Sequence, residues 1–429
     1  MSATGTTAGG DGPDEGWTGD VGTHVVGLHA AGTDLVGLLA KRSIVVCCGS
    51  GGVGKTTTAA ALGLLAAGIG RRACVVTIDP ARRLADALGA LDVANVPHRI
   101  PGPWPGELSA VMLDAKGTFD DLVRRYARDA VQAERILANR LYGNLVSVLS
   151  GTQEYMATEK LFELHEAGDF DLVVVDTPPT RNALDFLDAP RRLAGFLDNR
   201  IFRLLLTPGR AYLRAMSVAT QLLLRTLAKV AGSEIVEDTI AFFQAFEGME
   251  EGFRDRAARV ERLLAEEATG FVVVAAPRRD SVDEARFFAS RLAANGHGLD
   301  VVVVNRVHPD FGAREERSAG QGAGRPAVAG DDSAARTGDP PAAGTPAAPG
   351  GAGAGAWEAL STNLAEMDAV VARESSYIRS LTGITGGAPV VTVPILDDDV
   401  HDIGGLESVA RHLAGGELPW SGDQAGDRE

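Results

Sequence analysis

The chain has 429 residues, of which 45% are hydrophobic and 23% are charged, and its formal net charge is −16 at pH 7. That hydrophobic content supports a sizeable core, and the length allows either two or three domains or one elaborated α/β domain. The acidic balance argues against a general affinity for nucleic acid or anionic membranes, so no nucleic-acid partner is expected.

The first stretch of the chain lacks the features of a targeting segment. Residues 1–20 are rich in Gly, Thr and Asp, without a basic start or an apolar stretch, which predicts a disordered tail. No run of about 18 apolar residues occurs, so no membrane-spanning helix is expected. Cys47, Cys48 and Cys74 lie in predicted strands, which suits buried thiols in a reducing compartment. We therefore expect a cytoplasmic protein.

A phosphate-binding loop is the strongest motif. A lead-in helix is predicted within residues 21–39. In the stretch 44–57 that follows, an apolar strand leads into the pattern G-x-x-x-x-G-K-[ST], and an Ala/Leu-rich helix follows it. Lys55 would reach the β- and γ-phosphates, and the Thr56 hydroxyl would hold Mg²⁺. The alternative is a chance Gly-rich turn between a strand and a helix. The expected phosphate-binding residues are Gly51, Gly52, Val53, Gly54, Lys55, Thr56 and Thr57.

Two later strands each end in an aspartate. The apolar run 73–78 ends in Asp79, and the run 172–175 ends in Asp176. Open α/β sheets bind ligands at the carboxyl ends of their strands, so Asp176 is placed as the Mg²⁺-associated aspartate. A strand-ending turn built from Asp and Pro is the alternative. Between these runs the pattern predicts a strand over 110–114, a helix from Thr118 and a helix over 153–166.

The rest of the chain alternates between ordered and low-complexity segments. Residues 182–267 show helical periodicity and predict a helical insertion. Strands are expected over 271–274, 301–304 and 390–393, the last two followed by Asn305 and Pro394, with helices at 281–293 and from Trp357. Residues 312–356 are poor in large apolar side chains and predict a disordered insertion, and 416–429 form an acidic tail. The fold class is therefore α/β: a P-loop NTPase core spanning 21–311 and 357–415, with a mostly parallel sheet and helices on both faces.

Several motifs in the same order resemble one family. The resemblance is to the ArsA-type ATPases, which include the guided-entry targeting factors for tail-anchored membrane proteins, within the wider ParA/MinD-like P-loop group. It covers about residues 40–310 and 357–415. The motifs that carry it are the phosphate loop at 49–57, residues 77–81 and 84–86 as switch I, residues 151–164, residues 176–180 as switch II, Asn305, and residues 394–396 in the adenine loop.

The resemblance implies both an activity and an assembly. It implies an ATPase that uses ATP and Mg²⁺ and works as a dimer whose nucleotides lie near the interface. Lys55 and Asp79 would be catalytic, with Asp79 positioning the attacking water. Asp176 would lie in the Mg²⁺ shell, directly or through water, while Asn305 and Pro394 would frame the adenine. For Asn305 the alternative is a strand-terminal Asn in a turn.

The chain departs from the family pattern at Ser50. Many members of the wider group carry a second lysine there, which reaches the partner's nucleotide across the dimer, and a serine cannot supply that charge. Three arginines beside the switches could compensate, although each could equally be a solvated surface charge. These arginines are Arg82, Arg83 and Arg181.

Two further departures concern cargo. Arsenite needs converging thiolates, but Cys47 and Cys48 are strand neighbours that point to opposite faces, so an arsenical pump subunit is not expected. Tail-anchor targeting would imply a CxxC zinc dimer in some members and a Met-rich client groove. This chain has no CxxC, and its insertion holds only Met216 and Met249.

Three functions remain open. The leading hypothesis is an ATP-hydrolysing, dimerising switch that couples nucleotide state to a protein or membrane-protein client. The second is a weakly hydrolysing regulatory subunit in a hetero-oligomer with a paralogous ATPase, which Ser50 favours. The third is a ParA/MinD-like positioning ATPase, although the acidic, Gly-rich tail offers no membrane-binding helix.

Overall fold

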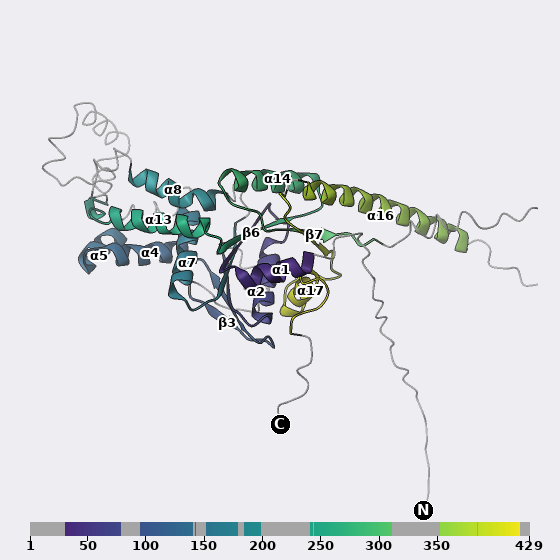
Figure 1. The fold of residues 1–429 in the computed structure, drawn as a ribbon, viewed down its shortest axis with the longest axis horizontal. Helices are drawn as coiled ribbons and strands as arrows, with labels where there is room; N and C mark the ends of the chain where they lie inside the picture. Colours follow the sequence, from purple (N-terminus) through teal and green to yellow (C-terminus); the bar gives the residue numbers. More distant parts are fainter. Residues whose placement is uncertain are drawn as a thin grey trace, which may run out of the picture.

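A single eight-stranded sheet forms the centre of the molecule (Figure 1). The computed structural model describes residues 31–78, 95–139, 142, 152–178, 184–198, 241–242, 244–310, 352–383 and 385–420. The strands lie in the order β3-β4-β2-β5-β1-β6-β7-β8. Their bounds are β1 Ile44–Gly49, β2 Arg72–Thr77, β3 His98–Ile100, β4 Glu107–Met112, β5 Leu172–Asp176, β6 Thr269–Ala275, β7 Val301–Val307 and β8 Val390–Pro394.

Every neighbouring pair of strands is parallel except β3 and β4, which pair antiparallel at one edge. The central strands are continuous Val-rich runs because helices bury them on both faces. Strand β1 lies between β5 and β6, with Cys47 opposite Asp176 and Gly49 opposite Val274. The carboxyl ends of the parallel strands therefore meet at one edge of the sheet, beside the loop that follows Gly49.

Helices cover the two faces of the sheet as separate layers. The first layer is α1 (Ala31–Lys41), α2 (Lys55–Gly68) and α17 (Ile403–Leu413), packed around Val45 and Cys47. The second is α7 (Thr152–Ala167), α8 (Leu184–Leu197), α13 (Glu250–Ala265), α14 (Arg279–Ala294) and the end of α16 (Ala352–Thr382), packed around Val46 and Cys48. Cys47 and Cys48 thus face opposite layers, as the strand alternation predicted.

A helical region extends from one end of the sheet. In Figure 1 it contains α4 (Ala115–Tyr126), α5 (Ala130–Leu137) and the outer parts of α7, α8 and α13, while α16 projects at the opposite end. Its core is rich in aromatic side chains, with Phe253 close to both Phe119 and Phe246. Met249 is buried in this cluster. That methionine is therefore part of the core, whereas Met216 lies outside the described residues.

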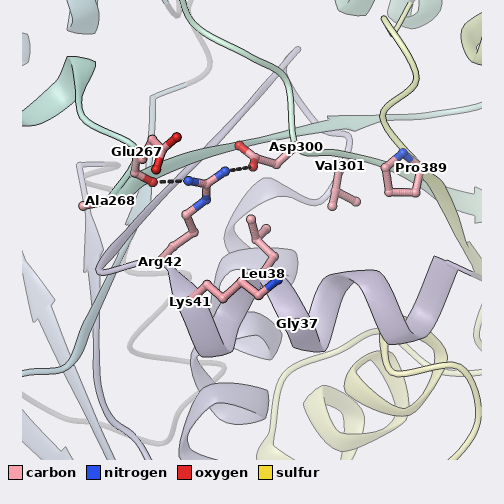
Figure 2. A pocket seen from close by; sticks show the side chains of 9 residues that line it. All are labelled: Gly37, Leu38, Lys41, Arg42, Glu267, Ala268, Asp300, Val301 and Pro389. Carbon is pink, nitrogen blue, oxygen red and sulfur yellow. Dashed lines mark hydrogen bonds and ion pairs between the residues drawn. The ribbon is translucent and has the colours of Figure 1, made fainter.

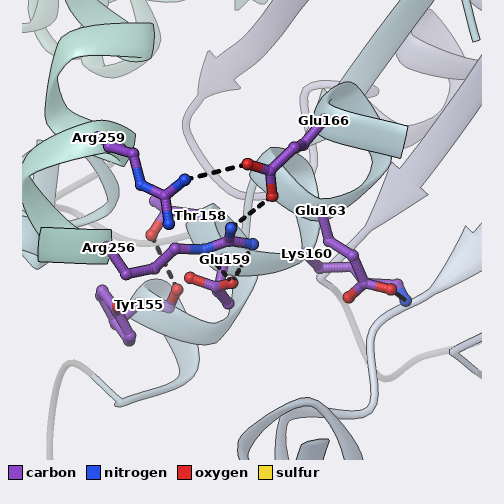
Figure 3. Close-up of polar contacts among 8 residues, drawn as sticks. All are labelled: Tyr155, Thr158, Glu159, Lys160, Glu163, Glu166, Arg256 and Arg259. Atoms are coloured by element: carbon purple, nitrogen blue, oxygen red, sulfur yellow. Dashed lines mark hydrogen bonds and ion pairs between the residues drawn. The ribbon is translucent and has the colours of Figure 1, made fainter. Parts of the chain in front are cut away.

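A buried ion-pair network joins α7 to α13 (Figure 3). The Arg256 side chain is 1% exposed and lies 2.6 Å from carboxylate oxygens of both Glu159 and Glu166. Its guanidinium also stacks over the Phe162 ring, 4.1 Å from the centroid. Burial raises the pKa of Glu159, while hydrogen bonding to Arg256 lowers the pKa of Glu166. The helical region is therefore tied to the helix that precedes β5.

The alternation of strands and helices confirms the predicted fold class. The lead-in helix spans Ala31–Lys41, and residues 21–30 lie outside the described part of the chain. Helices α8 and α13 fall in the predicted insertion, whose residues 199–240 are not described. Helix α16 already begins at Ala352, before the predicted start at Trp357. The ranges 1–20, 312–351 and 421–429 lie outside the described residues, and β3, α5 and α17 were not predicted.

We find no helix with both the length and the apolar character needed to cross a membrane in the described ranges.

Candidate nucleotide-binding site

The loop between β1 and α2 contains three glycines in backbone conformations that other residues rarely adopt. Gly49, Gly52 and Gly54 have φ values of 151°, 76° and 94°, in the left-handed region that favours glycine. A Cβ on Gly49 would lie 2.1 Å from the Val274 carbonyl oxygen, and one on Gly54 would lie 2.2 Å from Asn305 Nδ2. Gly51 and Gly52 are exposed and Val53 is buried. The loop is therefore held closely between β6 and β7 while its tip faces outward.

Helix α2 begins at Lys55, the residue predicted to bind the β- and γ-phosphates. Gly54 is its N-cap, and Lys55, Thr56 and Thr57 form its first turn, where backbone N–H groups point out of the helix end. This end carries the positive pole of the helix dipole and favours an anion. Lys55 is 6% exposed, and its Nζ donates to the Ser50 carbonyl oxygen at 2.8 Å. Its charge thus lies inside the curve of the loop.

Asp176 joins the loop to two strands. It ends β5 and is fully buried, and its Oδ2 accepts hydrogen bonds from Thr56 Oγ1 at 2.7 Å and from Thr77 Oγ1 at 2.9 Å. Thr177 Oγ1 in turn donates to the Cys47 carbonyl oxygen at 2.8 Å. Hydroxyl and carboxylate oxygens are the donors that Mg²⁺ prefers, so Thr56 and Asp176 fit the predicted Mg²⁺ site by their chemistry and proximity.

Asn305 also reaches the loop, from the end of β7. Its Nδ2 donates to the Val53 carbonyl oxygen at 2.9 Å, and its Oδ1 accepts from the Arg306 backbone N–H at 2.9 Å. Pro394 ends β8 and pairs with Val307, so it lies one strand farther from the loop. The structure thus brings the two predicted adenine-framing residues to neighbouring strand ends.

Some predicted site residues lie outside the described part of the chain. They are Asp79, Arg82, Arg83 and Arg181. Ile78, just before Asp79, donates its N–H to the Asp176 carbonyl oxygen at 3.2 Å, and its own carbonyl accepts from Gln153 Nε2 at 3.4 Å. The chain therefore reaches Asp79 from a point beside Asp176 and the first turn of α7.

Ser50 has a partner that the sequence did not reveal. Its hydroxyl lies 3.2 Å from the hydroxyl of Ser281, a buried residue in the first turn of α14. The Ser281 hydroxyl also accepts the Ala276 backbone N–H at 2.9 Å. Ser50 is thereby connected to the loop after β6. Ser281 could not be recognised from the sequence because no motif includes it. Thr77 lies in the switch I motif, but its contact with Asp176 appears only in the folded sheet, where β2 and β5 are neighbours.

Burial keeps the three thiols near this site protonated. Burial is the main cause of a raised pKa at all three thiols. It raises the pKa of Cys48 and of Cys74 to about 12. The pKa of Cys47 lies well above its usual value, because burial and the nearby Asp176 carboxylate both raise it. All three cysteines are reduced and buried. Cys47 and Cys48 face opposite layers, so their thiols do not converge on a common ligand.

A separate cavity of about 800 Å³ lies at the opposite edge of the sheet (Figure 2). It is lined by the end of α1 and the starts of β7 and β8. Arg42 spans it, bonded to the Glu267 carbonyl oxygen and 2.5 Å from Asp300 Oδ1. None of the predicted site residues lines this cavity, so it is distinct from the phosphate loop.

Comparison with known proteins agrees with the geometry of the loop. Residues 42–319 match the model of the anion-transporting ATPase family. The chain belongs to this family. It is 20% identical to a putative arsenical pump-driving ATPase of Aquifex aeolicus over 88% of this chain and 80% of that protein. It is 33% identical to an uncharacterized protein of Streptomyces coelicolor over 61% of this chain and 62% of that protein. It is 30% identical to the ATPase get3 of Aspergillus terreus over 33% of this chain and 41% of that protein.

Family membership confirms the resemblance read from the motifs. The matched range contains the phosphate loop, both aspartate-ended strands and Asn305. The chain is accordingly an ATPase of the anion-transporting ATPase family with a P-loop fold.

Proposed function

We propose that this ATPase is a dimerising, Mg²⁺-dependent cytoplasmic switch whose nucleotide state controls its binding to a protein or membrane-protein client. The observation that carries the proposal is the pair of hydrogen bonds that Asp176 accepts from Thr56 and Thr77. Through them one buried carboxylate connects the phosphate loop with the end of β2, which leads directly to Asp79. A change at the γ-phosphate can thereby alter both acidic strand ends together.

Each residue has a role in this proposal. Lys55 and the first turn of α2 bind the phosphates, and Thr56 and Asp176 hold Mg²⁺, which when bound neutralises charge on the phosphate oxygens. Asp79 orients the attacking water and accepts its proton, as a carboxylate at this strand end can. Asn305 and Pro394 frame the adenine, with Asn305 at the same time securing the loop through the Val53 carbonyl.

A route from the site to the helical region supports the coupling. Gln153 at the start of α7 bonds to Ile78, and Glu159 and Glu166 farther along α7 bond to Arg256 of α13. A rearrangement at Asp79 would therefore reach α13 through one continuous helix and a buried ion pair. The client would be engaged by this helical region.

Nucleotide binding and hydrolysis test the proposal separately. Lys55→Ala should abolish tight Mg-ATP binding in calorimetry while the fold is kept, because it removes the phosphate-directed charge from the loop. Lys41→Ala, an exposed lysine at the far edge of the sheet, is the matched control. Asp79→Asn should retain ATP and slow single-turnover hydrolysis by orders of magnitude. Unchanged affinity in Lys55→Ala would contradict the loop assignment, and an unchanged rate in Asp79→Asn would move the catalytic role elsewhere.

A second candidate function is a weakly hydrolysing regulatory subunit paired with a paralogous ATPase. The hydroxyl of Ser50 lies against Ser281 in the same chain, so this position offers a partner's nucleotide no positive charge. In that case the paralogue would supply the missing cation. Turnover of the isolated chain, compared with its mixture with a paralogue that carries the lysine, separates the two functions.

A further inference from the structure

Arg306 adopts a backbone conformation that an arginine does not favour. Its φ is 63°, and within the described ranges Asn95 is the only other non-glycine residue with a positive φ. Asparagine tolerates this region because its short polar side chain bonds locally, and the Asn95 side chain accepts a hydrogen bond from Thr118. An arginine gains nothing comparable from its own side chain. Such conformations persist where the surrounding structure imposes them, and they are concentrated at functional sites.

A β-bulge imposes this conformation. The register between β7 and β8 shifts between Asn305 and Val307, so Arg306 is the extra residue. Its N–H is held by Asn305 Oδ1, while Asn305 Nδ2 holds the Val53 carbonyl of the phosphate loop. The same amide therefore fixes the bulge and the loop relative to each other. Bulges next to active sites commonly redirect a side chain, and this one has that effect.

The redirected side chain lies against the phosphate loop. Arg306 is exposed, and its Nη1 donates to the Gly52 carbonyl oxygen at 3.3 Å. That bond is long and its acceptor is neutral, so it does not offset the guanidinium charge. A guanidinium carries five N–H donors in a planar fork suited to phosphate oxygens. Arg306 thus presents a cation at the exposed lip of the loop, in addition to the buried Lys55.

Two other arginines, Arg278 and Arg279 at the start of α14, are exposed, but their ion-pair partners belong to α14 and not to the loop. Each lies 3.9 Å from a carboxylate, that of Asp280 and of Asp283 respectively. Ser50 is neutral and bonded to Ser281. Among the described residues outside the loop and α2, Arg306 is therefore the cation that combines contact with the loop and an imposed orientation toward it.

We propose that Arg306 binds the phosphate chain of the nucleotide at the lip of the loop, beside Gly52, in a loop where Ser50 supplies no charge. This inference rests on the proposed nucleotide site and adds a phosphate-binding residue to it. The binding residue comes from β7 rather than from the loop or the switches. A role in phosphate binding also explains why an arginine occupies a position where glycine or asparagine would cause less backbone strain.

Substitutions at this position separate strain from charge. Arg306→Gly and Arg306→Asn suit the left-handed backbone, so the nucleotide-free variants should melt at or above the temperature of the natural chain. Their affinity for Mg-ATP should nevertheless fall at least about tenfold, the effect of losing a charge-assisted hydrogen bond. Arg306→Lys should retain part of the affinity because it keeps the charge without the planar fork. Arg99→Gln, an exposed arginine on the edge strand β3, is the control for a lost surface charge.

Two probes test the phosphate assignment itself. Tripolyphosphate should lose affinity for Arg306→Gly by the same factor as ATP, whereas a loss confined to ATP would mean contact with adenine and overturn the proposal. Raising the KCl concentration should weaken ATP binding more steeply in the natural chain than in Arg306→Gly. If Arg306→Gly binds ATP normally while Lys55→Ala does not, the inference fails and the nucleotide site stands. If neither variant loses affinity, the nucleotide site itself is misplaced.

Discussion

At the scale of single residues, Gly54 offers the sharpest test of the loop geometry. Gly54→Ala should lower the free energy of unfolding by about 1–3 kcal/mol, because the residue has a φ of 94° and its new Cβ would meet the amide of Asn305. It should also weaken Mg-ATP binding, since the displaced Asn305 would release the Val53 carbonyl. Chemical denaturation and calorimetry measure the two effects.

Gly37 provides the matched control for that substitution. It lies within α1, and a Cβ there would meet no atom within 4 Å. Gly37→Ala should therefore raise the free energy of unfolding by about 1 kcal/mol through helix propensity alone and leave ATP binding unchanged. Similar destabilisation by both substitutions would show that the fold responds to any added methyl group and not to the geometry at Gly54.

The buried thiols predict how stability depends on pH. The folded pKa values of Cys48 and Cys74 are raised from 9.0 to about 12, so folding keeps protons that the unfolded chain loses above pH 9. The contribution of these protonated thiols to the free energy of unfolding is fully present below pH 9. It should fall by about 1.4 kcal/mol per pH unit for each thiol as the pH rises toward 12. Urea denaturation of Cys74→Val should show a shallower decline than the natural chain. Equal slopes would contradict burial of this thiol.

How far the site could be predicted depends on where each residue's signal lies. The phosphate loop and Asp176 could be recognised because a local pattern and a strand end define them, and the structure brings both together with Asn305. Ser281 and Arg306 could not, because their roles depend on strand order and on a bulge that has no sequence signature. Thr77 belongs to the switch I motif, but its bond to Asp176 depends on β2 lying next to β5. Asp79 was predicted from the same strand-end rule, and its assignment stays a prediction.

At the scale of elements, the contact between α7 and α13 depends on a buried charge. Arg256→Leu should destabilise the protein by about 3–5 kcal/mol at pH 7, because it leaves the Glu159 carboxylate buried without its partner. The loss should shrink as the pH falls, since Glu159, whose pKa burial already raises, can then become neutral. Thermal melts between pH 4.5 and 7.5 would follow both effects.

Two further variants identify the cause of that loss. Arg256→Leu combined with Glu159→Leu should recover much of the stability, because no charge is then left buried. Arg259→Leu should cost no more than about 1 kcal/mol, since Arg259 is 43% exposed and pairs with a half-exposed Glu166. If the double variant were as unstable as Arg256→Leu alone, packing rather than charge would hold the two helices together.

The elements that could be predicted are those whose hydrophobic residues form long runs or recur at a regular spacing. The Val-rich strands and the long amphipathic helices were expected because burial on two faces or on one leaves a clear pattern. The three-residue β3 is too short to show alternation, and α17 begins with Ile403, Gly404 and Gly405, which read as a loop. It forms because Asp402 caps it through the Gly405 N–H and because Leu406, Val409 and Leu413 pack against the first helical layer.

At the scale of the whole molecule, the strands and helices place the nucleotide site and its proposed connection to the helical region on one side of the sheet. The carboxyl ends of β1, β2, β5 and β7 converge on the loop, while the first turns of α7, next to the end of β2, pack in the helical region and α16 projects at the other end (Figure 1). Among the described residues, positive charge at this convergence comes from Lys55 within the loop and Arg306 at its lip. The position of Ser50 remains neutral, which makes the assembly of the molecule the decisive question.

Ser50→Lys addresses that question directly. If the proposed dimer brings two loops together, a lysine at this position can reach the partner's nucleotide and stabilise charge that develops on the transferring phosphate. The variant should then hydrolyse ATP at least about tenfold faster than the natural homodimer, a rate change equivalent to about 1.4 kcal/mol of transition-state stabilisation. Steady-state turnover measured across a range of protein concentrations tests this, because the gain should appear only where the dimer forms.

Ser50→Ala separates the charge from the lost hydroxyl. It removes the contact with Ser281 without adding a cation, so it should leave turnover near that of the natural chain or slightly below it. A similar gain in Ser50→Ala would mean that releasing the loop from α14 causes the acceleration. Robust turnover of the natural homodimer, with no gain from the lysine, would show that another cation already does this work. Arg306→Gly in the same assay would then show whether that cation is Arg306.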